Sequence, residues 1–187
     1  MTTQPYLLVI EPSLPVKSVK ELIAYSKTKP LTYGTSGIGT TVHLGMERLA
    51  ALSGAQFAHI PYKGTAPALV GLMSGEINMV PASAISGTAA VKTGKVRALA
   101  AMGTKRLAAA PEIPTVEEAG FPGFKIINSY NLFAPAGTPR PIINTINRIV
   151  SDGMNTPAMV QKLAAEGSEP GERLTRSEEH TSELSHT

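Results

Sequence analysis

Short apolar segments alternate with amphipathic helical segments along most of this chain, and this alternation restricts the fold more than any other feature. The pattern predicts strands at 6–10, 31–35, 57–60, 77–80 and 96–102, and each of them except the last is followed by a helix. Parallel strands need a helical crossover, and the connections between these segments are short. We therefore expect an α/β fold with a mainly parallel sheet covered by helices on both faces.

Signals for helix ends support this pattern. Ser18 and Glu21 have the spacing of a capping box, in which each side chain binds a free amide of the first helical turn, and Pro30 ends the helix that follows. Thr115 and Glu118 form a second box in a looser segment. That segment is expected to connect two parts of the fold.

The C-terminal third has a different organisation. A strand is expected at 126–134, and a helix is expected to begin with Thr138 as its cap and Pro139 in its first turn, and to restart at Pro157. Its apolar face holds Ile142, Ile146, Ile149 and Val150. From 171 to 187 the only aliphatic residues are Leu174 and Leu184, so this segment is expected to be disordered and not a natural part of the protein.

Composition excludes several classes of protein. The 17 Lys and Arg residues exceed the 14 Asp and Glu residues only slightly and are scattered singly, so no nucleic-acid partner is expected. The absence of cysteine excludes disulfides and thiolate chemistry. His43 and His59 have no His or carboxylate at a metal-like spacing, so each is expected to be structural, and neither a metal nor a cofactor is expected.

A glycine-rich stretch between a strand and a helix is the first candidate binding site. Its residues are Thr35, Ser36, Gly37, Gly39, Thr40 and Thr41. Glycine lets the backbone approach a ligand closely, and the free amides of a helix N-terminus favour an anion. An ordinary turn with Thr40 or Thr41 as helix cap is the competing interpretation. The stretch lacks the third Gly of a dinucleotide fingerprint, the Lys of a P-loop and the second Gly of a nucleophile elbow.

Two further strand ends carry similar residues. Tyr62, Lys63 and Gly64 follow the third strand, where Lys63 could attract a carboxylate, and Ala82 and Ser83 follow the fourth. Ligands in open α/β sheets bind at such edges. The three edges contain no paired carboxylates and no base beside a nucleophile, so we expect binding of an oxyanion and no enzyme activity.

Several long motifs occur in the order and spacing of a known family. They lie at 11–22, 33–40, 59–69, 94–100, 114–123 and 132–139, and together they resemble the Bug-type (TctC) solute-binding proteins of tripartite tricarboxylate transporters over roughly residues 5–170. The resemblance implies a type II periplasmic-binding-protein fold with one complete lobe and a C-terminal remnant of the other. It also implies that the N-terminal portion, with a signal peptide and the other lobe's ligand loops, is missing from this sequence.

The resemblance further implies a division of the chain and a role. Residues 1–9 would cross into the second lobe, 10–105 would form that lobe, 106–134 the return connection and crossing strand, and 135–170 the remnant of the first lobe. The protein would be a periplasmic monomer that captures a di- or tricarboxylate, an amino acid or an aromatic acid and delivers it to a membrane permease. A ligand-sensing regulatory domain of the same fold is the alternative, and a phosphate-handling enzyme is disfavoured because no base or metal-binding acid is found.

Overall fold

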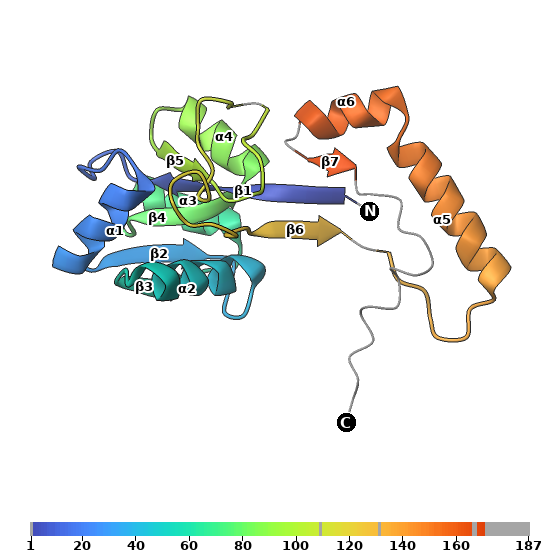
Figure 1. Cartoon of the computed structure of the whole chain (residues 1–187), viewed down its shortest axis with the longest axis horizontal. Helices are drawn as coiled ribbons and strands as arrows, with labels where there is room; N and C mark the ends of the chain where they lie inside the picture. Colours follow the sequence, from blue (N-terminus) through green and yellow to red (C-terminus); the bar gives the residue numbers. More distant parts are fainter. Residues whose placement is uncertain (1, 109, 131, 166–167, 171–187) are drawn as a thin grey trace.

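A central sheet with helices on both sides forms most of the computed structural model, which describes residues 2–108, 110–130, 132–165 and 168–170 (Figure 1). Its elements are β1 (Thr2–Ile10), α1 (Val19–Thr28), β2 (Leu31–Thr35), α2 (Thr41–Ser53), β3 (Phe57–Pro61), α3 (Thr65–Met73), β4 (Met79–Ser83), α4 (Ala84–Lys92), β5 (Arg97–Ala101), β6 (Ile127–Tyr130), α5 (Arg140–Met154), α6 (Pro157–Ala165) and β7 (Glu169–Pro170). No helix among the described residues is long and apolar enough to cross a membrane.

Strand β1 lies inside the sheet, between β4 and β5. The strand order is β3-β2-β4-β1-β5, and β6 and β7 pair with the first residues of β1. Leu8 and Ile10 belong to one buried cluster, and Leu7 and Val9 belong to another. Side chains alternate between the faces of a strand, so both faces of β1 are covered, as its continuous apolar sequence predicts.

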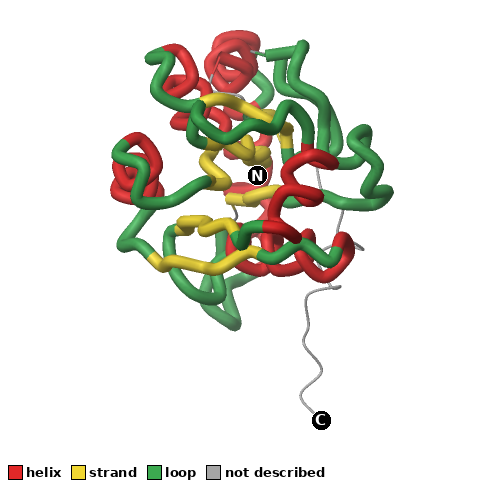
Figure 2. The backbone as a smooth tube through the Cα atoms, turned by 90° about the vertical axis from the view of Figure 1, so that its left-hand side faces the viewer, coloured by secondary structure: helices red, strands yellow, loops and turns green. Residues whose placement is uncertain are grey.

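Helices cover both faces of the sheet, as expected. The cluster on one face includes residues of α1, α2 and the segment 116–126, and the cluster on the other includes residues of α3 and α4. Figure 2 shows the strands in the middle with helices around them. The expected α/β class with a doubly covered sheet is confirmed.

The sheet is mixed, which corrects the expectation of a mainly parallel sheet. Strand β2 is parallel to β3 and β4, but β1 is antiparallel to both of its neighbours β4 and β5. Ile10 and Tyr33 both pair with Met79, so the connection through α1 returns the chain to the end of the sheet at which β1 finished. Strand β2 therefore runs opposite to β1.

The second expected capping box is present, whereas in the first the Glu21 carboxylate binds the amide of Lys17 and not that of the cap residue Ser18. The Glu21 amide donates to Ser18 Oγ at 3.2 Å, and the Glu21 carboxylate accepts from the Lys17 amide at 2.8 Å. The Thr115 amide donates to the Glu118 carboxylate at 2.7 Å, and the Glu118 amide donates to Thr115 Oγ1 at 3.0 Å. The second box closes turns and does not begin a helix.

Some expected boundaries are wrong. Strand β6 is shorter than the expected 126–134, and the cap of α5 is Pro139, because the Thr138 hydroxyl instead donates to the Pro135 carbonyl at 2.8 Å. Helix α5 has no buried residue, and Ile142, Ile146 and Ile149 of its apolar face are exposed. In Figure 1, α5 and α6 lie on the opposite side of the molecule from α1. The predicted disordered tail at 171–187 lies outside the described residues.

Candidate functional site

The three strand ends that the sequence singles out meet at one edge of the sheet. Thr35, the last residue of β2, is in register with Pro61 of β3, and the Tyr62 amide donates to the Thr35 carbonyl at 3.0 Å. Strand β4 lies on the other side of β2 and runs parallel to it, so Ser83 ends at the same edge. Residues far apart in the sequence are therefore brought together as expected.

Three helix N-termini lie along this edge. Helices α2, α3 and α4 begin at Thr41, Thr65 and Ala84, within a few residues of the strand ends. The first amides of a helix have no partner within the helix and carry a partial positive charge. The edge consequently carries several amide donors, and such donors suit an anion.

The edge faces the part of the molecule that contains β6 and β7. Ser83 pairs with Tyr6 of β1, and the preceding residues of β1, 2–5, pair with β6. In Figure 1, β2 accordingly points towards the side where β6, β7 and α5 lie. A ligand at this edge would lie beside the strands that connect the two parts of the chain.

Internal hydrogen bonds fix the shape of the Gly37–Thr40 loop. The buried Thr35 hydroxyl accepts from the Gly37 amide at 3.2 Å, and the Thr40 hydroxyl donates to the Gly37 carbonyl at 2.8 Å. Thr40 also caps α2, since its Oγ1 accepts from the His43 amide at 3.4 Å. Gly37 and Gly39 have φ angles of +138° and +76°, which disfavour any other residue. The hydroxyls of Thr35 and Thr40 therefore hold the loop together.

Other groups of this loop remain open to a ligand. Ser36 and Thr41 are exposed, and the amides of Thr41 and Val42 belong to the first turn of α2, where helix geometry supplies no acceptor. The interpretation of Thr40 as an ordinary helix cap is confirmed. The cap does not exclude an anion site, because it occupies the His43 amide and leaves the first two amides of the helix available to a ligand.

Two histidines lie beneath this loop. The rings of His43 and His59 are 4.1 Å apart between centroids, the Gly39 amide donates to His43 Nδ1 at 3.1 Å, and His59 Nε2 lies 2.7 Å from Thr35 Oγ1. Burial, and next the neighbouring His43, lower the pKa of His59 against the opposing effect of Glu47. Both histidines thus make structural hydrogen bonds, as the sequence predicts.

The second loop differs from the expectation at Tyr62. The Tyr62 ring lies against Gly34 and its hydroxyl is directed at Gly71 on α3, so the side chain packs inward. This hydroxyl is buried, and burial together with the nearby Glu76 carboxylate raises the pKa of Tyr62. Lys63 is exposed, and Gly64 has a φ of +122° immediately before α3. Lys63 and the first amides of α3 are the groups of this loop that a ligand could reach.

The third edge is part of a strand and not a loop. Residues 81–83 belong to β4, and the Ala82 side chain is fully buried opposite Leu7. Ser83 caps α4 by accepting from the Ser86 amide at 3.3 Å. The buried methyl group of Ala82 is closed to a ligand, and the helix-cap interpretation holds for Ser83.

Sequence analysis missed a fourth strand end at the same edge. Gly103, Thr104 and Lys105 follow β5, which is antiparallel to β1 and hence runs in the direction of β2 and β4. They line a hollow together with Ile127 and Ser168. The signal was available, because a Gly-Thr-Lys run after a strand resembles the Tyr62–Gly64 loop in composition.

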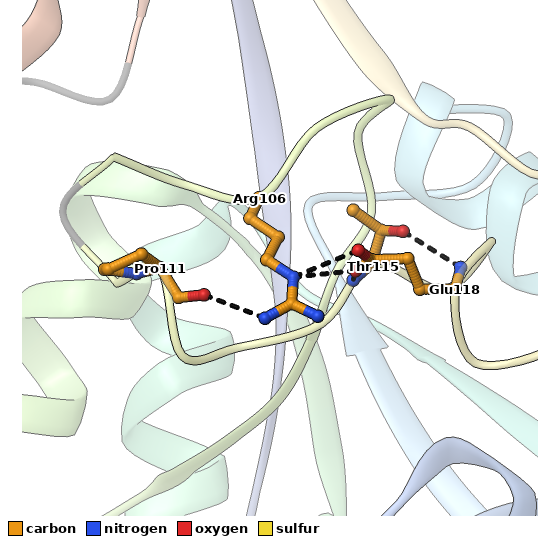
Figure 3. Close-up of polar contacts among 4 residues, drawn as sticks. All are labelled: Arg106, Pro111, Thr115 and Glu118. Carbon is orange, nitrogen blue, oxygen red and sulfur yellow. Dashed lines mark hydrogen bonds and ion pairs between the residues drawn. The ribbon is translucent and has the colours of Figure 1, made fainter.

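The chain beyond this fourth end is anchored by a cluster of polar contacts. The Arg106 guanidinium donates to both carboxylate oxygens of Glu118, at 3.1 and 2.9 Å, and to the Pro111 carbonyl at 3.0 Å (Figure 3). The hydrogen bond from the Thr115 amide, and next the Arg106 side chain, hold the pKa of Glu118 below its ordinary value. Among the described residues, no group of three or more His, Asp or Glu side chains could hold a metal ion.

Comparison with known proteins gives one consistent result. Residues 1–180 match the family model described as "Tripartite tricarboxylate transporter family receptor". The "UPF0065 protein in gbd 5'region" of Cupriavidus necator is 38% identical over 165 residues, which are 87% of this chain and 50% of that protein. BugT of Bordetella pertussis is 34% identical over 172 residues, which are 89% of this chain and 52% of that protein.

Solved structures are similar over the same range. Rpa4515 of R. palustris with adipate superposes with a TM-score of 0.84 at 34% identity, covering 91% of this chain and 58% of that one. MatC (Rpa3494) of Rhodopseudomonas palustris with bound malate superposes with a TM-score of 0.76 at 28% identity, covering 90% of this chain and 58% of that one. The chain spans about half the length of the curated relatives it matches. The expected α/β periplasmic-binding-protein fold is confirmed.

Proposed function

Since this chain belongs to the tripartite tricarboxylate transporter receptor (TctC) family, we propose that it is a periplasmic solute-binding protein that captures a small organic carboxylate and delivers it to a membrane permease. The observation that carries the proposal is the convergence of the N-termini of α2, α3 and α4 on one edge of the sheet. Binding would involve no chemical conversion of the ligand.

The proposed site uses amides and one cation. The amides of Thr41 and Val42, the Ser36 hydroxyl and Lys63 would hold one carboxylate, while Gly37, Gly39 and Gly64 allow the turns that bring these groups to the edge. Charge-assisted hydrogen bonds from amides suit an oxyanion. Thr35, Thr40 and Ser83 would support the site from within, and Tyr62 would pack beneath it.

Two similar proteins support a dicarboxylate ligand. One is in complex with adipate and the other with malate. We propose a ligand of this class for the full-length protein. The division into a crossing segment at 1–9, a lobe at 10–105, a return connection at 106–134 and a part of the other lobe at 135–170 remains a proposal as well.

Substitution of Thr41 by proline tests the site with little risk to the fold. Thr41 is the first helical residue of α2, where proline is well tolerated, and Thr40 has the extended conformation (φ −69°, ψ 158°) that a residue before proline prefers. Thr41→Pro removes one amide donor. In titration calorimetry of the full-length protein with adipate and malate, we expect the affinity to fall about tenfold or more.

The matched control is Thr41→Val, which removes the hydroxyl and keeps the amide. This variant should bind within a few-fold of the wild type. Equal affinities for the wild type and Thr41→Pro would show that the N-terminus of α2 does not hold the ligand. Absence of binding by every carboxylate, in a protein shown to be folded, would count against the proposed function itself.

A further inference from the structure

We propose that His43 and His59 are positioning residues that hold the Gly37–Thr40 loop in its ligand-binding shape, and that His43 does so only while its imidazole is uncharged. The inference deepens the proposed function, because it assigns the groups that fix the loop of that same site. It rests on the hydrogen bonds and the ring packing around the loop.

The contact of His43 defines its protonation state. The Gly39 amide donates to His43 Nδ1 at 3.1 Å, so Nδ1 must carry a lone pair and the ring proton must lie on Nε2. Gly39 has a φ of +76°, and a Cβ added to it would meet no atom within 4 Å. The hydrogen bond to His43 therefore ties this exposed glycine to helix α2.

His59 fixes the other end of the loop. Its Nε2 lies 2.7 Å from Thr35 Oγ1, which also accepts from the Gly37 amide. The Thr35 hydroxyl has a single proton, and the distance to His59 is shorter than the 3.1 Å to the Gly37 carbonyl. That carbonyl already accepts from the Thr40 hydroxyl. The arrangement is satisfied when His59 Nε2 is an acceptor.

The two rings lie against each other, so their charges are coupled. Their centroids are 4.1 Å apart and their planes are inclined by 32°. Two imidazolium rings in this contact would repel each other. His59 also lies 5.0 Å from the ring of Tyr33, and the Tyr33 hydroxyl donates to Glu47 at 2.5 Å. Tyr33 and Glu47 are thus ionisable groups beside the pair, and Glu47 favours a charged His59.

Protonation of His43 has a defined consequence for the loop. A proton on Nδ1 would point at the Gly39 amide proton, so the hydrogen bond would be lost and replaced by a contact of two donors. The end of the loop next to Thr41 would be released, and the amides proposed to bind the ligand would no longer be held in place.

The test combines pH with two substitutions of His43. His43→Asn keeps an acceptor at the position of Nδ1 but does not titrate, and His43→Leu has no acceptor. Amide spectra of the ligand-free protein report the Gly39 resonance from pH 8.0 to 5.5, and calorimetry with malate reports the affinity of the full-length protein over the same range.

The expected result has three parts. In the wild type, the Gly39 resonance moves and the affinity falls about fivefold as the pH decreases, the equivalent of one hydrogen bond. In His43→Asn, the Gly39 resonance and the affinity do not change with pH, and both stay near the values that the wild type has at pH 8.0. In His43→Leu, the affinity is low at every pH.

Three results would overturn the inference. The first is a wild-type affinity that rises as the pH falls, which would indicate direct attraction of the anion by the imidazolium. The others are a His43→Asn variant that follows the wild-type pH profile and a Gly39 resonance that does not move with pH. If His43→Leu does not fold, the pH profiles of the wild type and of His43→Asn still test the inference. The ligand-free spectra separate this inference from the proposed function, since they test the loop even where no carboxylate binds.

Discussion

Gly45 is a position where a single methyl group decides packing. The residue lies within α2, and an added Cβ would overlap Ile126 Cδ1 and lie 2.5 Å from Ile126 Cγ1. Alanine usually stabilises a helix relative to glycine by about 1 kcal/mol, while overpacking costs about 1–3 kcal/mol. We expect Gly45→Ala to lower the free energy of unfolding by about 1 kcal/mol, measured by urea denaturation.

Gly153 of α5 provides the matched control. An added Cβ there would meet no atom within 4 Å, so Gly153→Ala should be neutral or stabilising by up to about 1 kcal/mol. Adding Ile126→Val to Gly45→Ala removes the atom that clashes first and should recover part of the loss. A Gly45→Ala variant as stable as the wild type would mean that Ile126 moves aside without cost.

Glu118 should make stability depend on pH. Its pKa in the folded protein lies below the ordinary value, first because the Thr115 amide donates to the carboxylate and next because of Arg106. A depressed pKa means that the group contributes stability above its unfolded pKa, and that this contribution is lost as the pH falls through the folded pKa.

We expect Glu118→Gln to be less stable than the wild type at pH 7, and the difference to disappear in acid, below the folded pKa. Denaturation curves of both proteins from pH 7 to 3 measure this. Glu112→Gln, an exposed substitution in the same segment, serves as the control. A difference between wild type and Glu118→Gln that does not change with pH would contradict the role of the ionised carboxylate.

At the scale of elements, strand β1 and helix α5 should differ most in their protection. Leu7 to Ile10 are fully buried and pair on both sides, with β4 and β5. Helix α5 buries none of its residues. In hydrogen exchange followed by mass spectrometry, amides of β1 should exchange on the order of a hundredfold more slowly than those of α5. Equal protection would show that the exposed face of α5 is covered in solution.

Sequence patterns predicted most elements but not all of their ends. The predicted bounds of β2 were right because Pro30 and Gly34-Thr35 mark them, whereas β4 was expected to end before Pro81, a residue that cannot donate in a ladder. The strand continues because, in the described part of the chain, it pairs with β2 at Met79 and not at Pro81, so Pro81 needs no donor on that side. Strand β1 begins earlier than expected because β6 and β7 pair with its polar first residues.

At the scale of the whole molecule, the shared edge of three strand ends was predictable and the direction of β1 was not. Strands β2, β3 and β4 run in one direction, so their C-terminal ends share an edge whatever their order. Hydrophobic periodicity has no direction, and the reversal of β1 depends on where the 11–18 segment turns. Arg97 helps to fix that turn by donating to the Val16 and Leu14 carbonyls, a long-range contact that no local pattern contains.

Exposed apolar side chains are concentrated on the part of the molecule beyond β6. Phe133 is 85% exposed, and Ile142, Ile146 and Ile149 of α5 are 50%, 40% and 63% exposed. An apolar helix face of this kind favours association, because contact removes it from water. We expect this chain to associate with increasing concentration in analytical ultracentrifugation.

The pair Ile146→Asn and Ile149→Lys should weaken this association by about tenfold or more, because each substitution removes apolar area at the centre of the face. Ile38 is the control, since it is 77% exposed but lies on the Gly37–Thr40 loop, so Ile38→Asn should leave the association constant unchanged. If all three proteins sediment as monomers at every concentration, the face of α5 does not promote contact between copies. If Ile38→Asn weakens association as much as the α5 pair, the contact involves the sheet edge instead.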